Sequence, residues 1–147
     1  MVLLEKSLVL GTDCDKKNTV LSFVVPEGIA ALNICYTYTP KEPEETVAVE
    51  AVKTGLLCYG QQLTDKDPYH YLPAKNLITL SLDAPGGYRG AAHRQDAQQV
   101  HTISALAASC GFCAGAIEPG QWQISLNGHC ILCPVTCSLK ITGEVAE

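Results

Sequence analysis

The stretch Leu32-Asn-Ile-Cys-Tyr-Thr-Tyr-Thr39 alternates strictly between apolar and polar residues. Successive side chains of a β-strand point to opposite faces of a sheet, so this pattern predicts a strand with one buried side and one solvent-facing side. The pattern returns twice towards the C-terminus, in residues 121–127 and 135–142. The predicted buried sets are Leu32, Ile34, Tyr36 and Tyr38; Trp122, Ile124 and Leu126; and Val135, Cys137, Leu139 and Ile141.

Less regular apolar runs at residues 20–25, 77–82 and 100–105 predict further strands. The turn-forming sequences Pro26-Glu-Gly28 and Glu118-Pro-Gly120 punctuate them. Six or more short antiparallel strands favour a mainly β fold, an antiparallel β-sandwich of the jelly-roll kind.

One segment departs from the strand pattern. After Pro43 and two glutamates, the apolar residues Val49, Val52, Leu56 and Tyr59 recur at a spacing that places them on one helical face. Acidic residues suit a helix N-terminus, and Gly60 suits the C-terminal end. We therefore expect one inserted helix, over about residues 43–59, although residues 47–49 would also suit a short strand.

Length and charge limit the function classes. A chain of 147 residues with 47% apolar and 17% charged residues is typical of one globular domain, here residues 1–147. The net charge is −5, and only Lys16 and Lys17 are adjacent among ten basic residues. Nucleic acid needs a clustered basic face, so it is not an expected partner. No apolar run reaches the roughly 20 residues of a membrane span. A homo-oligomer remains open.

The N-terminus and the cysteines bear on the compartment. Residues 1–10 lack a basic leader, and Glu5 and Lys6 interrupt their apolar run, so we do not expect a secretory signal. We therefore expect a cytoplasmic protein, in which the eight cysteines are thiols or metal ligands. In a secreted protein the same cysteines would form four disulfides.

Four cysteines form the pattern C-x2-C-x16-C-x2-C: Cys110, Cys113, Cys130 and Cys133. Two such pairs can surround zinc tetrahedrally, which makes a small zinc-binding structural domain one hypothesis. The predicted strand 122–127 lies between the pairs and carries the chain roughly 20 Å at 3.3 Å per residue. The alternative is that the cysteines fill small sites in the core, as we expect for Cys14, Cys35, Cys58 and Cys137.

The segment 81–93 contains a Pro-Gly-Gly turn followed by Tyr88, Arg89 and His93. We interpret it as a loop in which the Arg89 guanidinium, the two imidazoles of His93 and His129, and glycine amides bind an anion or another polar ligand. Alternatively, Arg89 pairs with Asp83 or Glu118 and only holds the loop in place. We expect His70 and His101 to be surface residues.

Loop aromatics suggest a further alternative. Tyr69, Tyr71 and Tyr88 lie in predicted loops, and flat rings of this kind stack on sugars, so a carbohydrate-binding module is possible. The sequence has no G-x-S-x-G elbow, P-loop or dinucleotide fingerprint. We accordingly expect no catalysis by this chain.

Several landmarks occur in the order found in one bacterial module. Residues 81–93 resemble its D-x-x-G-x-R-G segment, residues 23–28 and 32–38 resemble its opening strands, and residues 118–124 resemble its x-P-G-x-W-x-V strand entry. This module precedes the catalytic half in a branch of the PHP-domain (polymerase and histidinol phosphatase) metal-dependent hydrolases. The likeness covers about residues 20–143. Cys110, Cys113, Cys130 and Cys133 depart from it.

The resemblance implies a β-sandwich with a non-catalytic, accessory role. It also implies that phosphoesterase chemistry lies in a following domain that opens with a His-x-His metal motif, which the present sequence does not contain. A PHP-type hydrolase domain, or another protein, is therefore the expected partner. No cofactor is expected, apart from the zinc of the four-cysteine alternative.

Overall fold

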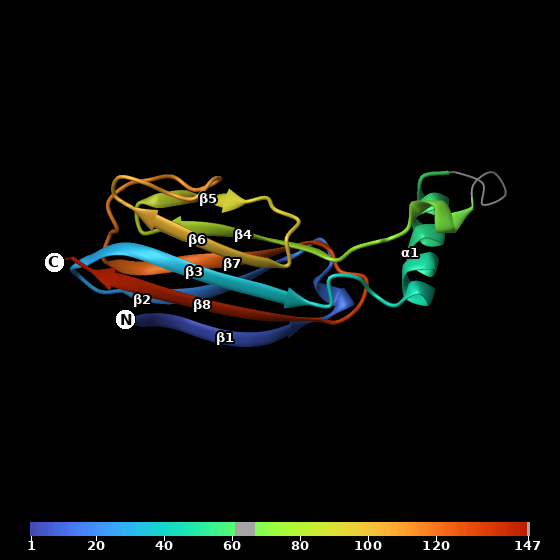
Figure 1. Ribbon diagram of the computed structural model, residues 1–147, viewed down its shortest axis with the longest axis horizontal. Helices are drawn as coiled ribbons and strands as arrows, with labels where there is room; N and C mark the ends of the chain where they lie inside the picture. Colours follow the sequence, from blue (N-terminus) through green and yellow to red (C-terminus); the bar gives the residue numbers. More distant parts are fainter. Residues whose placement is uncertain (61–66, 147) are drawn as a thin grey trace.

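Eight antiparallel strands of the computed structural model form two sheets packed face to face, ordered β1-β8-β3-β6 and β2-β7-β4-β5 (Figure 1). The structure describes residues 1–60 and 67–146. The strands are β1 (Val2–Leu10), β2 (Asn18–Val25), β3 (Ile29–Thr39), β4 (Leu77–Ala84), β5 (Gly87–Ala92), β6 (Gln98–Ser104), β7 (Gly120–Cys130) and β8 (Val135–Val145). A 3-10 turn, η1 (Thr12–Cys14), joins β1 to β2.

The pairing of the strands is nested. β4 pairs with β5, β3 with β6, β2 with β7 and β1 with β8, and successive pairs alternate between the two sheets. The chain therefore folds like one long hairpin that is wrapped into two layers, with the Pro85-Gly86 turn at its tip. This is the jelly-roll arrangement, so the predicted fold class is confirmed.

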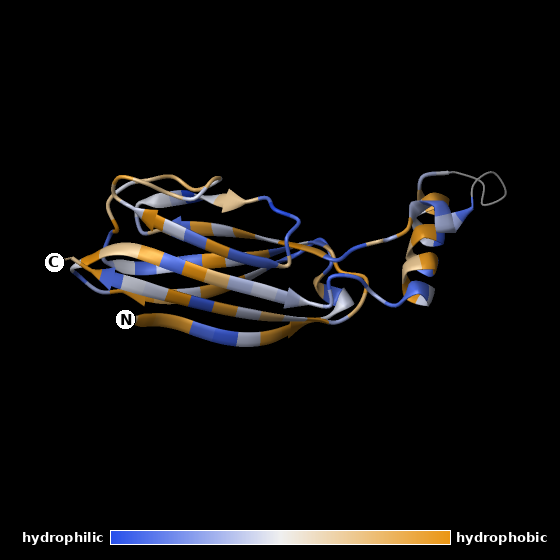
Figure 2. Cartoon of the chain, viewed as in Figure 1, coloured by the Kyte–Doolittle hydropathy of each residue, from blue (hydrophilic) through white to orange (hydrophobic). Residues whose placement is uncertain are grey.

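The core lies between the inner faces of the two sheets and consists of the residues that alternation selected. Trp122, Ile124, Leu126, Leu32, Ile34 and Tyr36 are completely buried, as are Val135, Cys137 and Ile141. Figure 2 shows apolar positions alternating with polar ones along the strands. Each large apolar side chain buried in this way contributes about 1.5–3 kcal/mol. Two-layer closure over Trp122 is the source of the stability of the fold.

Two strands lie outside the sequence prediction. In β1 the apolar residues stand in two blocks around Glu5-Lys-Ser7 instead of alternating, and most side chains of this edge strand are exposed. Residues 81–93, predicted as a loop, instead form the β4–β5 hairpin. Because β5 is rich in glycine and alanine, it lacks an alternating pattern of large side chains.

The predicted helix is present as α1 (Glu45–Cys58), in the connection from β3 to β4, and a short 3-10 helix, η2 (Pro68–Tyr71), follows it. This connection projects beyond one end of the sandwich (Figure 1). We call residues 40–60 and 67–76 the arm. Within the described part of the chain, no helix has the length and apolar character needed to cross a membrane.

Candidate functional site

Arg89, the predicted anion-binding residue, is buried within the fold and serves a structural purpose. Its side chain is only 8% exposed. The guanidinium donates hydrogen bonds to the carbonyl oxygens of Cys113, Gly115 (3.0 Å) and Ala116 (2.9 Å), and it lies 5.3 Å from the ring centroid of Trp122. It therefore fastens the 105–119 loop to the sandwich. The alternative that Arg89 holds a loop fits this geometry, except that its partners are carbonyl oxygens in place of Asp83 and Glu118.

The glycine that follows Arg89 permits the same loop to approach. Gly90 has a φ of +113°, and a Cβ there would lie 2.3 Å from the carbonyl oxygen of Gly111. Gly111 in turn has a φ of +95°, and its carbonyl oxygen accepts the Ala91 amide proton at 2.9 Å. Only glycine suits two backbones that meet so closely. The Arg-Gly pair of the motif thus locks a loop in place.

His93 and His129, the other two predicted site residues, do come together. Their ring centroids are 5.9 Å apart. They line a pocket of about 200 Å³ on the β4–β7 side of the molecule, close to the arm. The lining residues are Leu77, Thr79, His93, Arg94, Gln95 and His129. Arg94, which the sequence analysis did not select, thus takes the place in the pocket that was predicted for Arg89. The sequence signal that could have identified Arg94 is its position directly after His93.

Side-chain hydrogen bonds between β4 and β7 position the His129 ring. The Nε2 atom of His129 lies 2.8 Å from the hydroxyl oxygen of Thr79, which also accepts a hydrogen bond from Asn127 Nδ2 at 3.4 Å. Thr79 is only 2% exposed. These two contacts hold the His129 ring against a buried residue of β4.

The four predicted zinc ligands do not assemble. The first cysteine pair lies near Ile124 of β7: the Cys113 amide donates to the Arg89 carbonyl, and the next residue, Gly90, aligns across the sheet with Leu82 and Ile124. The second pair lies at the other end of β7, where Cys130 pairs with Leu77. Cys130 lies six positions after Ile124 along β7, which corresponds to about 20 Å at 3.3 Å per residue. No group of three or more metal-binding side chains occurs among residues 1–60 and 67–146. Burial also raises the pKa of the Cys130 thiol, which disfavours the thiolate that zinc requires.

The remaining cysteines divide between core and surface. Cys137 is buried, and Cys14 packs partly against the core, as predicted. Cys35 and Cys58 are exposed, which corrects the expectation that they fill core sites. Cys35 occupies an outward position of β3, between the buried residues Ile34 and Tyr36, and Cys58 ends the helix of the projecting arm.

His101 is a second correction, since it was predicted on the surface and is only 1% exposed. The inner face of β6 carries Gln99, His101 and Ile103, while Val100 faces solvent. His101 Nε2 donates a hydrogen bond to Gln99 Oε1 at 2.9 Å, and the ring centroid lies 5.1 Å from that of Phe112. Its Nδ1 atom has no hydrogen-bond partner among the described residues.

We expect His101 to make the fold acid-sensitive. Burial, followed by the nearby charge of Arg94, lowers its pKa below the ordinary value of 6.5. Below pH 6.5 the unfolded chain then takes up a proton that the folded protein refuses. Stability is complete above this pH and falls by up to about 1.4 kcal/mol per pH unit, until the pH passes the folded-state pKa. Urea unfolding at a series of pH values between 8 and 5 measures this loss of unfolding free energy. His101→Gln should flatten this dependence, and an unchanged pH profile in that variant would contradict the assignment.

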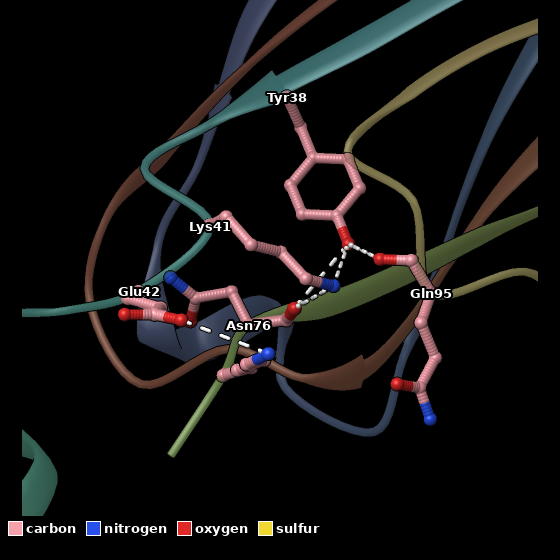
Figure 3. Close-up of polar contacts among 6 residues, drawn as sticks. Tyr38, Lys41, Glu42, Asn76 and Gln95 are labelled. Carbon is pink, nitrogen blue, oxygen red and sulfur yellow. Dashed lines mark hydrogen bonds and ion pairs between the residues drawn. The ribbon is translucent and has the colours of Figure 1, made fainter. Parts of the chain in front are cut away.

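The two chain segments that join the arm to the sandwich, residues 38–41 and 75–77, meet around the completely buried Asn76 (Figure 3); we call them the neck. The Asn76 side chain donates to the carbonyl oxygen of Pro40 at 3.0 Å and accepts the amide proton of Leu132 at 2.8 Å. Lys41 Nζ donates to the hydroxyl of Tyr38 (2.6 Å) and to the Asn76 carbonyl (2.9 Å). These bonds tie both legs of the arm to β3 and to the loop before β8, and so fix the direction in which the arm leaves the sandwich.

Beyond its neck, the arm presents apolar side chains to solvent. Within α1 only Ala48 and Val49 are buried. Exposed apolar or aromatic residues on the arm are Val47, Leu57, Tyr59, Tyr69 and Tyr71. A groove of about 280 Å³, lined by Val52, Gly55, Leu56, Tyr59 and Tyr71, runs along the helix. Helices of globular proteins normally bury their apolar face, whereas no described residue covers much of this one.

The three tyrosines of the carbohydrate hypothesis do not share a surface. Tyr69 and Tyr71 belong to η2 in the arm. Tyr88 pairs with Asp83 beside the β4–β5 turn, at the end of β4 remote from the arm. A stacking platform needs rings on one face, so this geometry does not favour the sugar-binding alternative.

A scan against models of known protein families finds no match to this chain, and a search of curated proteins finds none either.

Proposed function

We propose that this chain is a non-catalytic accessory module that binds a PHP-type hydrolase domain through the arm. The observation that carries the proposal is an exposed apolar helix held in a fixed direction by a buried polar neck. The likeness of residues 20–143 to the module that precedes such hydrolases supplies the identity of the partner. The free thiols of all eight cysteines suit a reducing compartment, which supports a cytoplasmic location.

The arm has the composition of an interaction surface. Contiguous exposed apolar residues mark docking sites, and tyrosine contributes strongly to interfaces because its ring is large and loses little entropy on binding. Leu57, in the last turn of α1, is 59% exposed, and Tyr59, directly after the helix, is 87% exposed. Burial against a partner removes this area from water.

Charge on the arm indicates the chemistry of the partner's surface. Lys53 is paired with Glu50 at 2.8 Å and Lys75 with Glu42 at 3.7 Å. Glu44 and Glu45, at the start of α1, make no ion pair with a described residue. An apolar partner surface with basic residues at its rim would complement this arrangement.

The test measures the affinity of the chain for PHP-type hydrolase domains encoded in the same genome, by isothermal titration calorimetry. We expect saturable binding. The double variant Leu57→Ser/Tyr59→Ser should weaken it by roughly 30-fold or more, because interface hot spots cost about 2 kcal/mol or more when truncated.

A matched control removes exposed apolar side chains from the sandwich. Val24→Ser/Val100→Ser changes two residues that are each 66% exposed and lie far from the arm. Its affinity should equal that of the unmodified chain. Absence of binding to every such domain, or equal losses in both double variants, would overturn the proposal; self-association lost only in the arm variant would assign the arm to a second copy instead.

A further inference from the structure

We propose that the pocket formed by Thr79, His93, Arg94 and His129 binds a small phosphate-type oxyanion. This inference is independent of the arm's partner, because it concerns a different surface. It keeps His93 and His129 from the site predicted from sequence and replaces Arg89 with Arg94.

The pocket is a locally basic site in an acidic chain. The chain carries a net charge of −5, yet none of the six residues that line the pocket is acidic. Arg94 is exposed and forms no ion pair with any described residue. Lys16 Nζ donates to the carbonyl oxygen of His129 but also lies 3.8 Å from Asp15 Oδ1, so Arg94 is the unpaired cation, among the described residues, that an anion entering the pocket would meet.

One of the donors, His129, is held in position before a ligand arrives. Thr79, which is buried, fixes the His129 ring through the 2.8 Å contact with Nε2, which leaves Nδ1 for a ligand. The ring centroids of His93 and His129 are 5.9 Å apart, so the two imidazoles are in contact with each other and both line the pocket. Arg94 and the Gln95 amide add donors from the segment after β5. A guanidinium donates two parallel bonds to a phosphate, the strongest geometry for this purpose.

The same two histidines could suggest a metal ion, but their surroundings favour an anion. A protein metal site generally needs three or more ligands, and no third metal-binding side chain joins this pair among the described residues. Arg94, which makes no ion pair with a described residue, would also repel a cation. A phosphate has more negative charge and more acceptor oxygens than a carboxylate, so it uses more of these donors.

The pocket adjoins the neck of the arm. Gln95 lines the pocket, and its carbonyl oxygen accepts a hydrogen bond from Tyr38 in the neck at 3.4 Å. Leu77, another lining residue, directly follows Asn76. The proposed anion therefore binds where the arm leaves the sandwich.

The test is a titration of the ¹⁵N-labelled chain with inorganic phosphate at pH 7 and constant ionic strength, followed by amide chemical shifts. We expect saturable shifts confined to Thr79, residues 93–95 and His129, with a dissociation constant of about 1 mM or lower. Arg94→Ala should weaken binding about tenfold or more, because it removes a charge-assisted pair of bonds. Lys6→Ala, which removes one positive charge from the other sheet, should leave the affinity unchanged.

Two further probes separate the alternatives. Acetate should bind more weakly than phosphate, and Zn²⁺ should not saturate the site at submillimolar concentration. Shifts that do not saturate, equal losses in Arg94→Ala and Lys6→Ala, acetate affinity equal to that of phosphate, or Zn²⁺ bound by the two histidines would each overturn the inference. None of these results depends on whether the arm binds a hydrolase.

Discussion

Replacement of Arg89 by alanine is expected to lower the free energy of unfolding by at least about 3 kcal/mol. A hydrogen bond from a charged donor contributes about 1.5–3 kcal/mol, and the Arg89 guanidinium serves three carbonyl oxygens of the 113–116 segment. The variant also loses the contact with the Trp122 ring. Equilibrium unfolding in urea, followed by Trp122 fluorescence, measures the change.

Two variants control this prediction. Arg94→Ala removes an exposed arginine five residues away and should stay within about 0.5 kcal/mol of the unmodified chain. Arg89→Lys keeps the charge but lacks the planar fork, so it should recover only part of the lost stability. Equal stability of Arg89→Ala and Arg94→Ala would show that Arg89 does not hold the loop. If Arg89→Ala fails to fold, the intermediate stability of Arg89→Lys still reports the effect.

Replacement of Asn76 by leucine is expected to cost about 2–5 kcal/mol. The apolar side chain has similar size but leaves the Pro40 carbonyl and the Leu132 amide without partners, and an unsatisfied buried polar group costs about 1–3 kcal/mol. Both groups belong to segments that fix the neck of the arm. Thermal and urea unfolding measure the loss of stability.

Gln95→Ala is the matched control at the neck. Gln95 joins the network through its main-chain carbonyl, so the loss of its exposed side chain should change stability by less than about 0.5 kcal/mol. A small effect of Asn76→Leu, comparable to that of Gln95→Ala, would mean that the neck tolerates the lost bonds. In that case the direction of the arm would not be fixed by Asn76.

The two kinds of site place different demands on the fold. The arm requires a rigid base, which the buried Asn76 and the Lys41–Tyr38 contact provide. The pocket requires an oriented imidazole, which the buried Thr79 provides. Both depend on the start of β4: Asn76 directly precedes the strand, and Leu77 and Thr79 belong to its first three residues. This end of the sandwich is therefore where ligand and partner would meet.

The histidines show why sequence reasoning succeeds for one residue and fails for another. His93 was selected because it belongs to the 81–93 segment, and His129 because it lies at the end of a predicted strand; the fold brings the two rings together. His101 was assigned to the surface from its residue type, although its position alternates with Ile103, which is completely buried. In β6 the polar side chains face inwards beneath Phe112. The alternation of inward and outward positions along β6 predicts that His101 is buried, whereas the usual preference of histidine for the surface predicts the opposite.

The sequence alone determined that this chain forms sheets and which side chains fill the core, through the alternation of apolar and polar residues in three segments: 32–39, 121–127 and 135–142. That information is local, because covalent geometry turns each successive side chain to the opposite face. Whether Arg89 or Arg94 joins the histidines was decided only by the tertiary structure. A register shift between Leu82 and Asp83 leaves Arg89 as an extra residue that turns inwards, and one residue of slip reverses the face of a strand. The distance between the two cysteine pairs likewise follows from strand pairing, which depends on contacts between residues far apart in the chain.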